Sequence, residues 1–292
     1  MRIIVPYPPG SSYDTVSRVI GEALNESLGQ PFIVDNRIGA SGTIGVNLLA
    51  QADTDGHTIG VFGNNQLILP AVSTKPPYDL ARDLAPLGIV ALIDSVIVIN
   101  PSLPAKNLRE LVALFKASPG KYRYGSGGIA SSSHLMSAMF ASMTGVELLH
   151  VPYRGGSLGI VALMGNEVQM QVTTLVNAKP LINSGKLRGM AVASHQRTPF
   201  MPEMPTAAEA GLPGYEFMQW FSMFAPAKTP ATLLTQISSE IGKTVEREKV
   251  RARFAGIGAH PHYQRPVELA ALIRRETAAF RKVARESGIE LR

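Results

Sequence analysis

Short apolar runs alternate with helix-like patterns along the chain. Residues 3–5 form an apolar, β-branched run typical of a buried strand, and apolar residues then recur with helical spacing from Val16 to Leu28. Further strands are predicted over residues 30–36 and 57–62, with a helical pattern between them. Strands that alternate with helices predict a parallel α/β sheet, in which ligands bind at the carboxyl ends of the strands.

The same alternation returns later in the chain. Strands are predicted over residues 87–90, 96–99, 121–124, 148–153, 168–172, 187–193 and 215–225. A helix from residue 229, a loop over 256–263 and a final helix close the chain, and neither helix has a sheet of its own. We therefore expect two α/β domains, a discontinuous first domain of residues 1–98 and 222–292 and an inserted second domain of residues 99–221.

The loop after the first strand is the first candidate site. Prolines and Gly10 stop the strand, and Ser11 and Ser12 precede the helix. The N–H groups and the dipole at a helix N-terminus favour an anion. Ser11 or Ser12 could equally act as a helix cap alone. Tyr7 on this rigid loop could form a wall of the site or be a core aromatic.

A second strand, Gly/Ser loop and helix N-terminus follows about 120 residues later, over residues 125–134. Two such loops, one in each domain, could close on one small anion. Asn64, at the end of the third strand, is a further candidate or a turn residue. The candidate contacts in the second loop are Ser126, Gly127, Ser131, Ser132 and His134.

Two motifs favour enzymes instead. Gly125, Gly127 and Ala130 fit the dinucleotide pattern G-x-G-x-x-A, but Glu147 precedes the next strand rather than ending it. Ser157 lies in a G-x-S-x-G turn, which could belong to a hydrolase. Its partners would be Glu203 and either His260 or His262, which occupy a predicted loop. An NAD-dependent oxidoreductase and a serine hydrolase therefore remain as alternatives to binding.

Composition narrows the function classes. The 292 residues are 45% apolar and include no cysteine, so disulfides and thiolate chemistry are excluded. The six histidines show no metal-ligand spacing, and we expect neither a metal nor a cofactor. Apolar residues 87–99 are too few to span a membrane. Met1 directly precedes the first strand, which leads us to expect that a targeting segment has been removed.

The net charge of +6 is located in one region. Residues 241–292 hold 12 Lys/Arg and 6 Asp/Glu, whereas the first 240 residues hold 16 of each. Acidic residues interleave with the basic ones, which is typical of a solvated helix face rather than a nucleic-acid surface. Anion recognition elsewhere must then rest mainly on dipoles and hydroxyl groups.

Several blocks, in order along essentially the whole chain, resemble one family. They are residues 3–10 (IIVPYPPG), 29–37 (GQPFIVDNR), 39–42 (GASG), 124–126 (YGS) with Ser131, Ser132 and His134, 151–155 (VPYRG), 185–188 (GKLR) and 205–215 (PTAAEAGLPGY). The chain resembles the periplasmic receptors of tripartite tricarboxylate transporters, the Bug-type solute-binding proteins.

The resemblance implies a two-domain Venus-flytrap fold in the periplasm. It also implies capture of a small carboxylate by the two loops, through backbone N–H groups, hydroxyls and water, and delivery to a membrane permease. We expect a monomer that is not an enzyme.

Three departures from the family pattern bear on the ligand. Ser11 replaces a usual glycine, Ile129-Ala130 replaces Asn-Gly, and Thr173-Thr174 replaces Asp-Asn. Loss of that acid removes a partner for a ligand ammonium, and Ile129 adds apolar surface. We therefore expect a dicarboxylate or an aromatic carboxylate without an amine, with Thr173 and Thr174 among its contacts.

Overall fold

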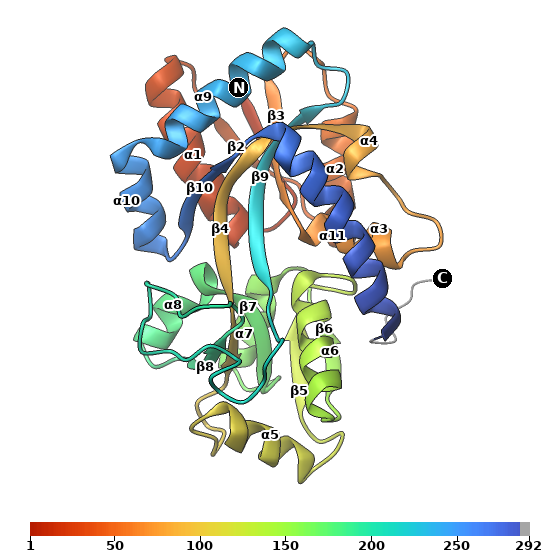
Figure 1. The fold of residues 1–292 in the computed structure, drawn as a ribbon, viewed down its shortest axis with the longest axis vertical. Coiled ribbons are helices and arrows are strands. Elements are labelled where there is room, and N and C mark those ends of the chain that lie inside the picture. The colour runs from red at the N-terminus through yellow and green to blue at the C-terminus, as the bar shows by residue number, and fades with distance from the viewer. Residues whose placement is uncertain (287–292) are drawn as a thin grey trace. The chain divides into compact units, whose positions relative to one another are not determined.

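The chain forms two compact units that are joined by two strands. The structure is a computed structural model that describes the backbone of residues 1–286 and the side chains of residues 1–282. Unit 1 comprises Met1–Leu92 and the chain from Trp220 onward, and unit 2 comprises Ile93–Gln219. The chain passes between them in β4 (Leu84–Ile99) and β9 (Met218–Pro226) (Figure 1).

Unit 1 begins with three β-strands that are each followed by a helix. Its first segment holds β1 (Arg2–Val5), α1 (Ser12–Leu28), β2 (Ile33–Asn36), a 3-10 turn (Ala40–Gly42), α2 (Thr43–Ala50), β3 (Thr58–Gly63), α3 (Asn65–Val72) and α4 (Leu80–Asp83). Its second segment adds α9 (Ala231–Glu246), α10 (Glu248–Ile257), β10 (His260–Gln264) and α11 (Pro266–Glu286). Helix α1 packs against α9 and α10, and α11 packs against α3 (Figure 1).

The sheet of unit 1 is mixed. Strand β1 lies between β2 and β3 and is parallel to both, with Ile3 opposite Val34 on one side and Ile59 on the other. Strand β9 runs antiparallel to β3, and β10 runs antiparallel to β4. Ile3 is fully buried, as its place in the central strand requires, because helices cover both faces of such a sheet.

Unit 2 repeats the alternation of strands and helices. It contains α5 (Leu108–Lys116), β5 (Arg123–Ser126), α6 (Ser132–Thr144), β6 (Leu149–Pro152), α7 (Gly156–Met164), β7 (Met170–Thr174), α8 (Leu175–Asn183) and β8 (Arg188–Val192). Strand β5 lies between β6 and β7 and is parallel to both, and β4 runs antiparallel to β7 and β8.

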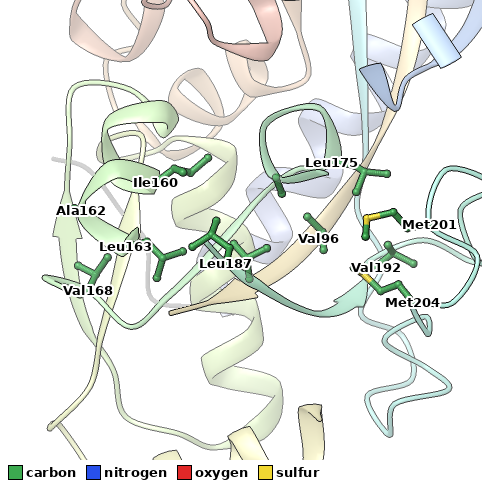
Figure 2. Packing of buried hydrophobic residues seen from close by; sticks show 12 residues of the cluster. Val96, Ile160, Ala162, Leu163, Val168, Leu175, Leu187, Val192, Met201 and Met204 are labelled. Carbon is green, nitrogen blue, oxygen red and sulfur yellow. The ribbon is translucent and has the colours of Figure 1, made fainter. Parts of the chain in front are cut away.

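An apolar cluster fixes the helices of unit 2 on its sheet. Leu163 of α7 and Leu175 of α8 are fully buried together with Val96 and Val192 from the sheet (Figure 2). Met201 and Met204 from the segment after β8 complete it. Burying each of these side chains stabilises the unit by roughly 1.5–3 kcal/mol. The cluster keeps the strand ends, and the loops that follow them, in fixed positions.

Three expectations differ from the observed elements. Residues 84–99 form the single strand β4 rather than two strands. Its first half pairs with β10 and its second half pairs with β7. His260 and His262 lie in strand β10 rather than in a loop. Pro261 is tolerated there because β10 has a partner on one side only, β4. Helix α10 was not predicted as a separate helix. The two strand features depend on long-range pairing that local patterns do not report, whereas α10 is separated from α9 by the extended backbone of Arg247.

The boundaries of the compact units lie inside strands. We predicted domain boundaries after residues 98 and 221, whereas the compact units divide after Leu92 and Gln219, within β4 and β9. Within the described residues, no helix combines the length and the apolar character needed to cross a membrane.

Candidate functional site

The loop between β1 and α1 ends in a capped helix. Ser11 is the N-cap residue of α1, with φ −71° and ψ 160°, and its Oγ accepts a hydrogen bond from the N–H of Asp14 at 3.3 Å. Ser11 and Ser12 are both buried. The capping geometry predicted for Ser11 is therefore present. It leaves the N–H groups of the first turn directed out of the helix end, where they can meet an anion.

Asp14 ties this loop to the helix. Its carboxylate accepts hydrogen bonds from Gly10 N–H at 3.0 Å, from Asn36 Nδ2 at 3.1 Å and from Arg18 Nε and Nη2, both at 2.9 Å. Burial alone would raise the pKa of Asp14, but the hydrogen bonds from Arg18, Gly10 and Asn36 outweigh it and lower the pKa. Because Arg18 offsets the charge of Asp14, the helix end keeps its preference for an added anion.

The loop between β5 and α6 has the same cap. Ser131 has φ −80° and ψ 160°, and its Oγ accepts from the N–H of His134 at 3.2 Å. The N–H of Ser131 donates to Gly128 O at 3.1 Å, as that of Ser11 donates to Pro8 O at 3.1 Å. The two loops predicted to act together thus have matching local geometry, 120 positions apart.

The match extends to the residue before each cap. Gly10 has φ +78° and Ala130 has φ +59°. Left-handed backbone is easy for glycine and strained for a residue with a Cβ, such as Ala130. The N–H of Gly10 donates to the side chain of Asp14, and the N–H of Ala130 donates to Nδ1 of His134 at 3.2 Å. In each loop, the side chain of the third residue after the cap accepts a hydrogen bond from the left-handed residue and so stabilises the turn.

Three stacked rings lie against the second loop. The ring of His150 lies 4.9 Å from that of Tyr124 and 4.0 Å from that of His134, with interplanar angles of 16° and 12°, and the rings of Tyr124 and His134 are 6.4 Å apart. Burial, and to a lesser degree the charge of His150, lowers the pKa of His134 to about 4. Burial also lowers the pKa of His150 and raises that of Tyr124 to about 12. All three rings are therefore uncharged at neutral pH.

Hydroxyl groups brace the backbone of the second loop. Ser126 Oγ lies 2.6 Å from His150 Nε2 and accepts from Gly128 N–H at 3.1 Å. Gly127 N–H donates to Ser133 Oγ at 2.8 Å, and Ser131 Oγ donates to Gly128 O at 2.7 Å. Ser133 and His150 were not predicted as site residues. The run of three serines at 131–133 could have indicated Ser133 as a site residue.

Tyr7 lies in the core of unit 1. Its hydroxyl accepts from Gln66 Nε2 at 3.0 Å, and its ring packs 4.7 Å from that of Tyr13, which packs 4.5 Å from Phe221. Burial raises the pKa of Tyr7. These contacts anchor the first loop, of which Tyr7 is part, to the core of unit 1. Asn64, a further candidate in unit 1, is buried directly before α3.

Thr174 carries a buried hydroxyl that the protein does not satisfy. It occupies the N-cap position of α8 without a side-chain cap bond, and it is 4% exposed. Its Oγ1 has no hydrogen-bond partner among the described residues. Buried polar groups without a partner are rare in folded proteins and usually form a hydrogen bond to water or a ligand. Its neighbour Thr173 is equally buried, opposite Val96 of β4.

Gln219 joins segments that are far apart in the sequence. Its Nε2 lies 3.3 Å from Ser95 Oγ on β4, and its Oε1 lies 3.5 Å from Ser132 Oγ at the start of α6. Gln219 and Ser95 were not predicted, because no local pattern links β4, α6 and β9. This amide places a further polar group beside the second loop.

The residues of the candidate hydrolase site are divided between the two units. Ser157 lies in the first turn of α7 in unit 2, whereas His260 and His262 lie on β10 in unit 1. Glu203 is exposed. The histidine that bonds a serine hydroxyl in unit 2 is His150, and its partner is Ser126. Within residues 1–286, no three His, Asp or Glu side chains gather closely enough to hold a metal ion.

The excess of basic residues near the C-terminus is partly paired with acids of α1. Lys249 lies 2.6 Å from Glu26, and Arg253 bonds Glu22. Arg251 pairs with Glu246 within the same region at 3.0 Å. These are exposed ion pairs on a solvated face, which agrees with the interpretation of the charge pattern.

Comparisons with known proteins agree with this arrangement. A family model described as the tripartite tricarboxylate transporter family receptor matches residues 16–289. Protein BugT from Bordetella pertussis is 33% identical over 294 residues, which is 100% of this chain and 90% of that protein.

Solved structures are similar over nearly the whole chain. An R. palustris protein with adipate has a TM-score of 0.96 and 31% identity, and the match covers 99% of this chain and 97% of that one. MatC from Rhodopseudomonas palustris with bound malate has a TM-score of 0.91 and 28% identity, covering 97% and 98%. The expected α/β fold of a periplasmic binding protein is confirmed, and the chain belongs to the receptor family of tripartite tricarboxylate transporters.

Proposed function

We propose that this solute-binding receptor captures a small carboxylate that has no amine, with an aliphatic dicarboxylate or an aromatic carboxylate favoured. The observation that carries the proposal is the matched pair of capped helix N-termini behind Ser11 and Ser131. Two such ends suit a ligand with two anionic groups, or one with an anionic group and a polar group. Adipate and malate, the molecules in two similar structures, are dicarboxylates.

The proposed contacts come from both units. In unit 1 they are Tyr7, Gly10, Ser11, Ser12 and Asn64, and in unit 2 they are Ser126, Gly127, Ser131, Ser132, His134, Thr173 and Thr174. The buried, unsatisfied hydroxyl of Thr174 supports its place in this set. Backbone N–H groups and hydroxyls would supply the recognition.

We expect a ligand without an amine because neither loop offers an acidic side chain that is free to pair with it. Asp14 is the carboxylate of the first loop, and Arg18 already pairs with it through two hydrogen bonds. The second loop contains none, and Thr173 and Thr174 stand where many family members have an acid. A ligand ammonium would therefore lose its hydration without gaining a charged partner.

The wider role follows from the family. We propose that the protein works in the periplasm as a monomer and delivers its ligand to the permease of a tripartite transporter. The two compact units would act as its two domains and close on one ligand. It would catalyse no reaction.

A calorimetric screen tests the ligand class. Adipate, malate, benzoate and glutamate would each be titrated into the protein at pH 7.5. We expect heat of binding for at least one of the three ligands without an amine, and none for glutamate. Tight binding of glutamate with no binding of the others would contradict the proposal.

A matched pair of variants tests the site. Thr174→Val removes the unsatisfied hydroxyl and keeps the shape, and we expect it to weaken binding by roughly 5- to 30-fold, on the scale of one lost hydrogen bond. Thr244→Val removes another buried hydroxyl without a partner among the described residues, on α9, and should leave the affinity unchanged. Equal affinities of both variants would remove Thr174 from the site.

A further inference from the structure

The hydrogen bond between Ala130 and His134 requires a particular state of the imidazole. His134 Nδ1 accepts the N–H of Ala130 at 3.2 Å, so this nitrogen carries no hydrogen and Nε2 carries it instead. An imidazolium ion has N–H groups at both positions. Protonation of His134 would therefore set two donors against each other and release Ala130, whose backbone is left-handed at φ +59°.

His150 links the same stack to a second point of the loop. Its ring lies 4.0 Å from that of His134, and its Nε2 lies 2.6 Å from Ser126 Oγ. Ser126 Oγ in turn accepts the N–H of Gly128. The ionisable groups that stack with His150 are His134 on α6 and Tyr124 on β5. Two neighbouring positive charges at this distance would repel each other strongly in a buried setting.

The first loop is held by a charged side chain, whereas the second is held by a neutral one. Asp14 holds Gly10 as His134 holds Ala130, but Asp14 does so as a carboxylate whose charge is offset by Arg18. Arg18 and the other donors lower the pKa of Asp14. Mild acid should therefore leave the first loop intact, and a proton-dependent change would arise in unit 2.

We propose that His134 and His150 are positioning residues that hold the loop of residues 126–131 in its binding shape only while both rings are neutral, so that protonation of this histidine stack lowers the affinity for carboxylate. The proposal rests on the proposed function, because it assumes that this loop contacts the ligand. It assigns to His150 a role that acts through Ser126, and to His134 a role that acts through Ala130.

Nuclear magnetic resonance tests the histidine stack in the ligand-free protein. The imidazole nitrogens and the amide of Ala130 would be followed from pH 8 to pH 4 with 15N-labelled protein. We expect His134 to carry its hydrogen on Nε2 at pH 7. We also expect the Ala130 amide signal to move in step with His134 protonation. An Nδ1–H tautomer at pH 7, or an Ala130 signal that ignores the titration, would overturn the proposal.

Binding measurements test the link to the ligand. Adipate would be titrated into wild type and His134→Asn between pH 7.5 and pH 4, with malate as a second probe. Asparagine places a carbonyl oxygen near the position of Nδ1, so it keeps an acceptor for Ala130 but takes up no proton. Because the pKa of His134 is about 4, half of this side chain is protonated at pH 4, so we expect the wild-type affinity to fall about twofold more than that of His134→Asn over this range.

Two further variants complete the test. His195→Asn changes an exposed histidine of unit 2 that faces Glu216, and it should keep the wild-type pH profile. His150→Phe keeps a ring in the stack but loses the nitrogen beside Ser126, and it should weaken binding at every pH. Protonation of the ligand affects all variants equally, so the differences between profiles report the histidines.

The outcomes separate the two proposals. Identical pH profiles of wild type and His134→Asn would overturn the role of the histidine stack while leaving the receptor function in place. A wild type that binds no carboxylate at pH 7.5 would overturn the proposed function and the effect on affinity with it. The magnetic resonance titration would still decide whether the stack controls the loop.

Discussion

Asp14 and His134 occupy the same position relative to their helix caps, and each accepts the N–H of the left-handed residue that precedes the cap. Ser11 and Ser131 supply the caps themselves. One loop is thus locked by a carboxylate with an arginine partner and the other by a neutral imidazole. The predictions below separate these roles.

Ser11→Ala should affect both stability and binding. Loss of the N-cap hydrogen bond should lower the free energy of unfolding by about 1 kcal/mol. If the hydroxyl also contacts the ligand, carboxylate affinity should fall as well. Urea denaturation and calorimetry measure the two effects separately. Ser11→Asn, which retains a capping side chain, is the control for stability. An unchanged affinity of Ser11→Ala would leave Ser11 as a cap alone.

Asp14→Asn should loosen the first loop. The variant loses the charged hydrogen bonds to Arg18, and we expect the free energy of unfolding to fall by roughly 1–3 kcal/mol. Because the pKa of Asp14 is lowered in the fold, its stabilisation is present above the ordinary pKa of 3.8 and is lost as pH falls through the folded value. Urea midpoints at pH 7 and pH 3 measure this.

The control for Asp14 is Glu268→Gln on α11, whose ion pair with Arg265 is exposed. We expect that change to leave the stability close to that of wild type, because the pair is exposed to solvent. Equal stabilities of Asp14→Asn and Glu268→Gln at pH 7 would argue against a structural role for the pair of Asp14 and Arg18.

Acid should destabilise the protein through His134. Its pKa is about 4 in the fold against 6.5 ordinarily, so the unfolded chain binds the proton more readily. The free energy of unfolding should therefore decrease as pH falls from about 6.5 to about 4, and stay low below that. His134→Asn should flatten this part of the profile, as measured by urea midpoints from pH 7.5 to pH 4. A variant profile parallel to that of wild type would assign the loss to other groups.

Glu276 and Trp220 form a partly buried hydrogen bond whose strength depends on the charge of the carboxylate. Trp220 Nε1 donates to Glu276 Oε2 at 2.8 Å, and burial raises the pKa of Glu276. The charged carboxylate thus reduces stability as pH rises above its ordinary pKa. Glu276→Gln keeps an acceptor without the charge and should be as stable as wild type or more so at pH 7.

Glu276→Ala is the opposing variant. It leaves the indole N–H without that acceptor, and we expect a loss of about 1–3 kcal/mol. Because Trp220 is the only tryptophan, its fluorescence reports both the unfolding transition and the change in its surroundings. A stability of Glu276→Gln below that of wild type would show that the carboxylate charge itself stabilises the fold.

Local sequence signals were sufficient for the two loops. A strand, a Pro/Gly or Gly/Ser loop and a capping serine are contiguous in the chain, so the positions of Ser11 and Ser131 followed from neighbouring residues. The side chains that brace the loops did not. His150 meets Ser126 from 24 positions away, and Gln219 meets Ser95 from 124 positions away. Such pairs depend on strand order, which hydrophobic periodicity does not report.

The same limit explains the elements that were misassigned. The run at residues 84–99 is apolar on both sides of Asp94, and only its partners reveal one strand. Similarly, His260-Pro-His262 has no strand-like pattern and is fixed by pairing with β4. The parallel arrangement of β1, β2 and β3, in contrast, follows from the alternation of strands and helices along this part of the chain.

The passage of β9 back into unit 1 has a consequence for the order in which the protein folds. Gly60 of β3 pairs with Phe224 of β9, about 160 positions later. Unit 2 is contiguous in the chain and can form all its contacts once its own residues are made. The sheet of unit 1 is complete only after β9 and β10 have joined it. Closing the large loop between β3 and β9 is slow. Unit 2 should therefore gain protection from hydrogen exchange before unit 1 during refolding.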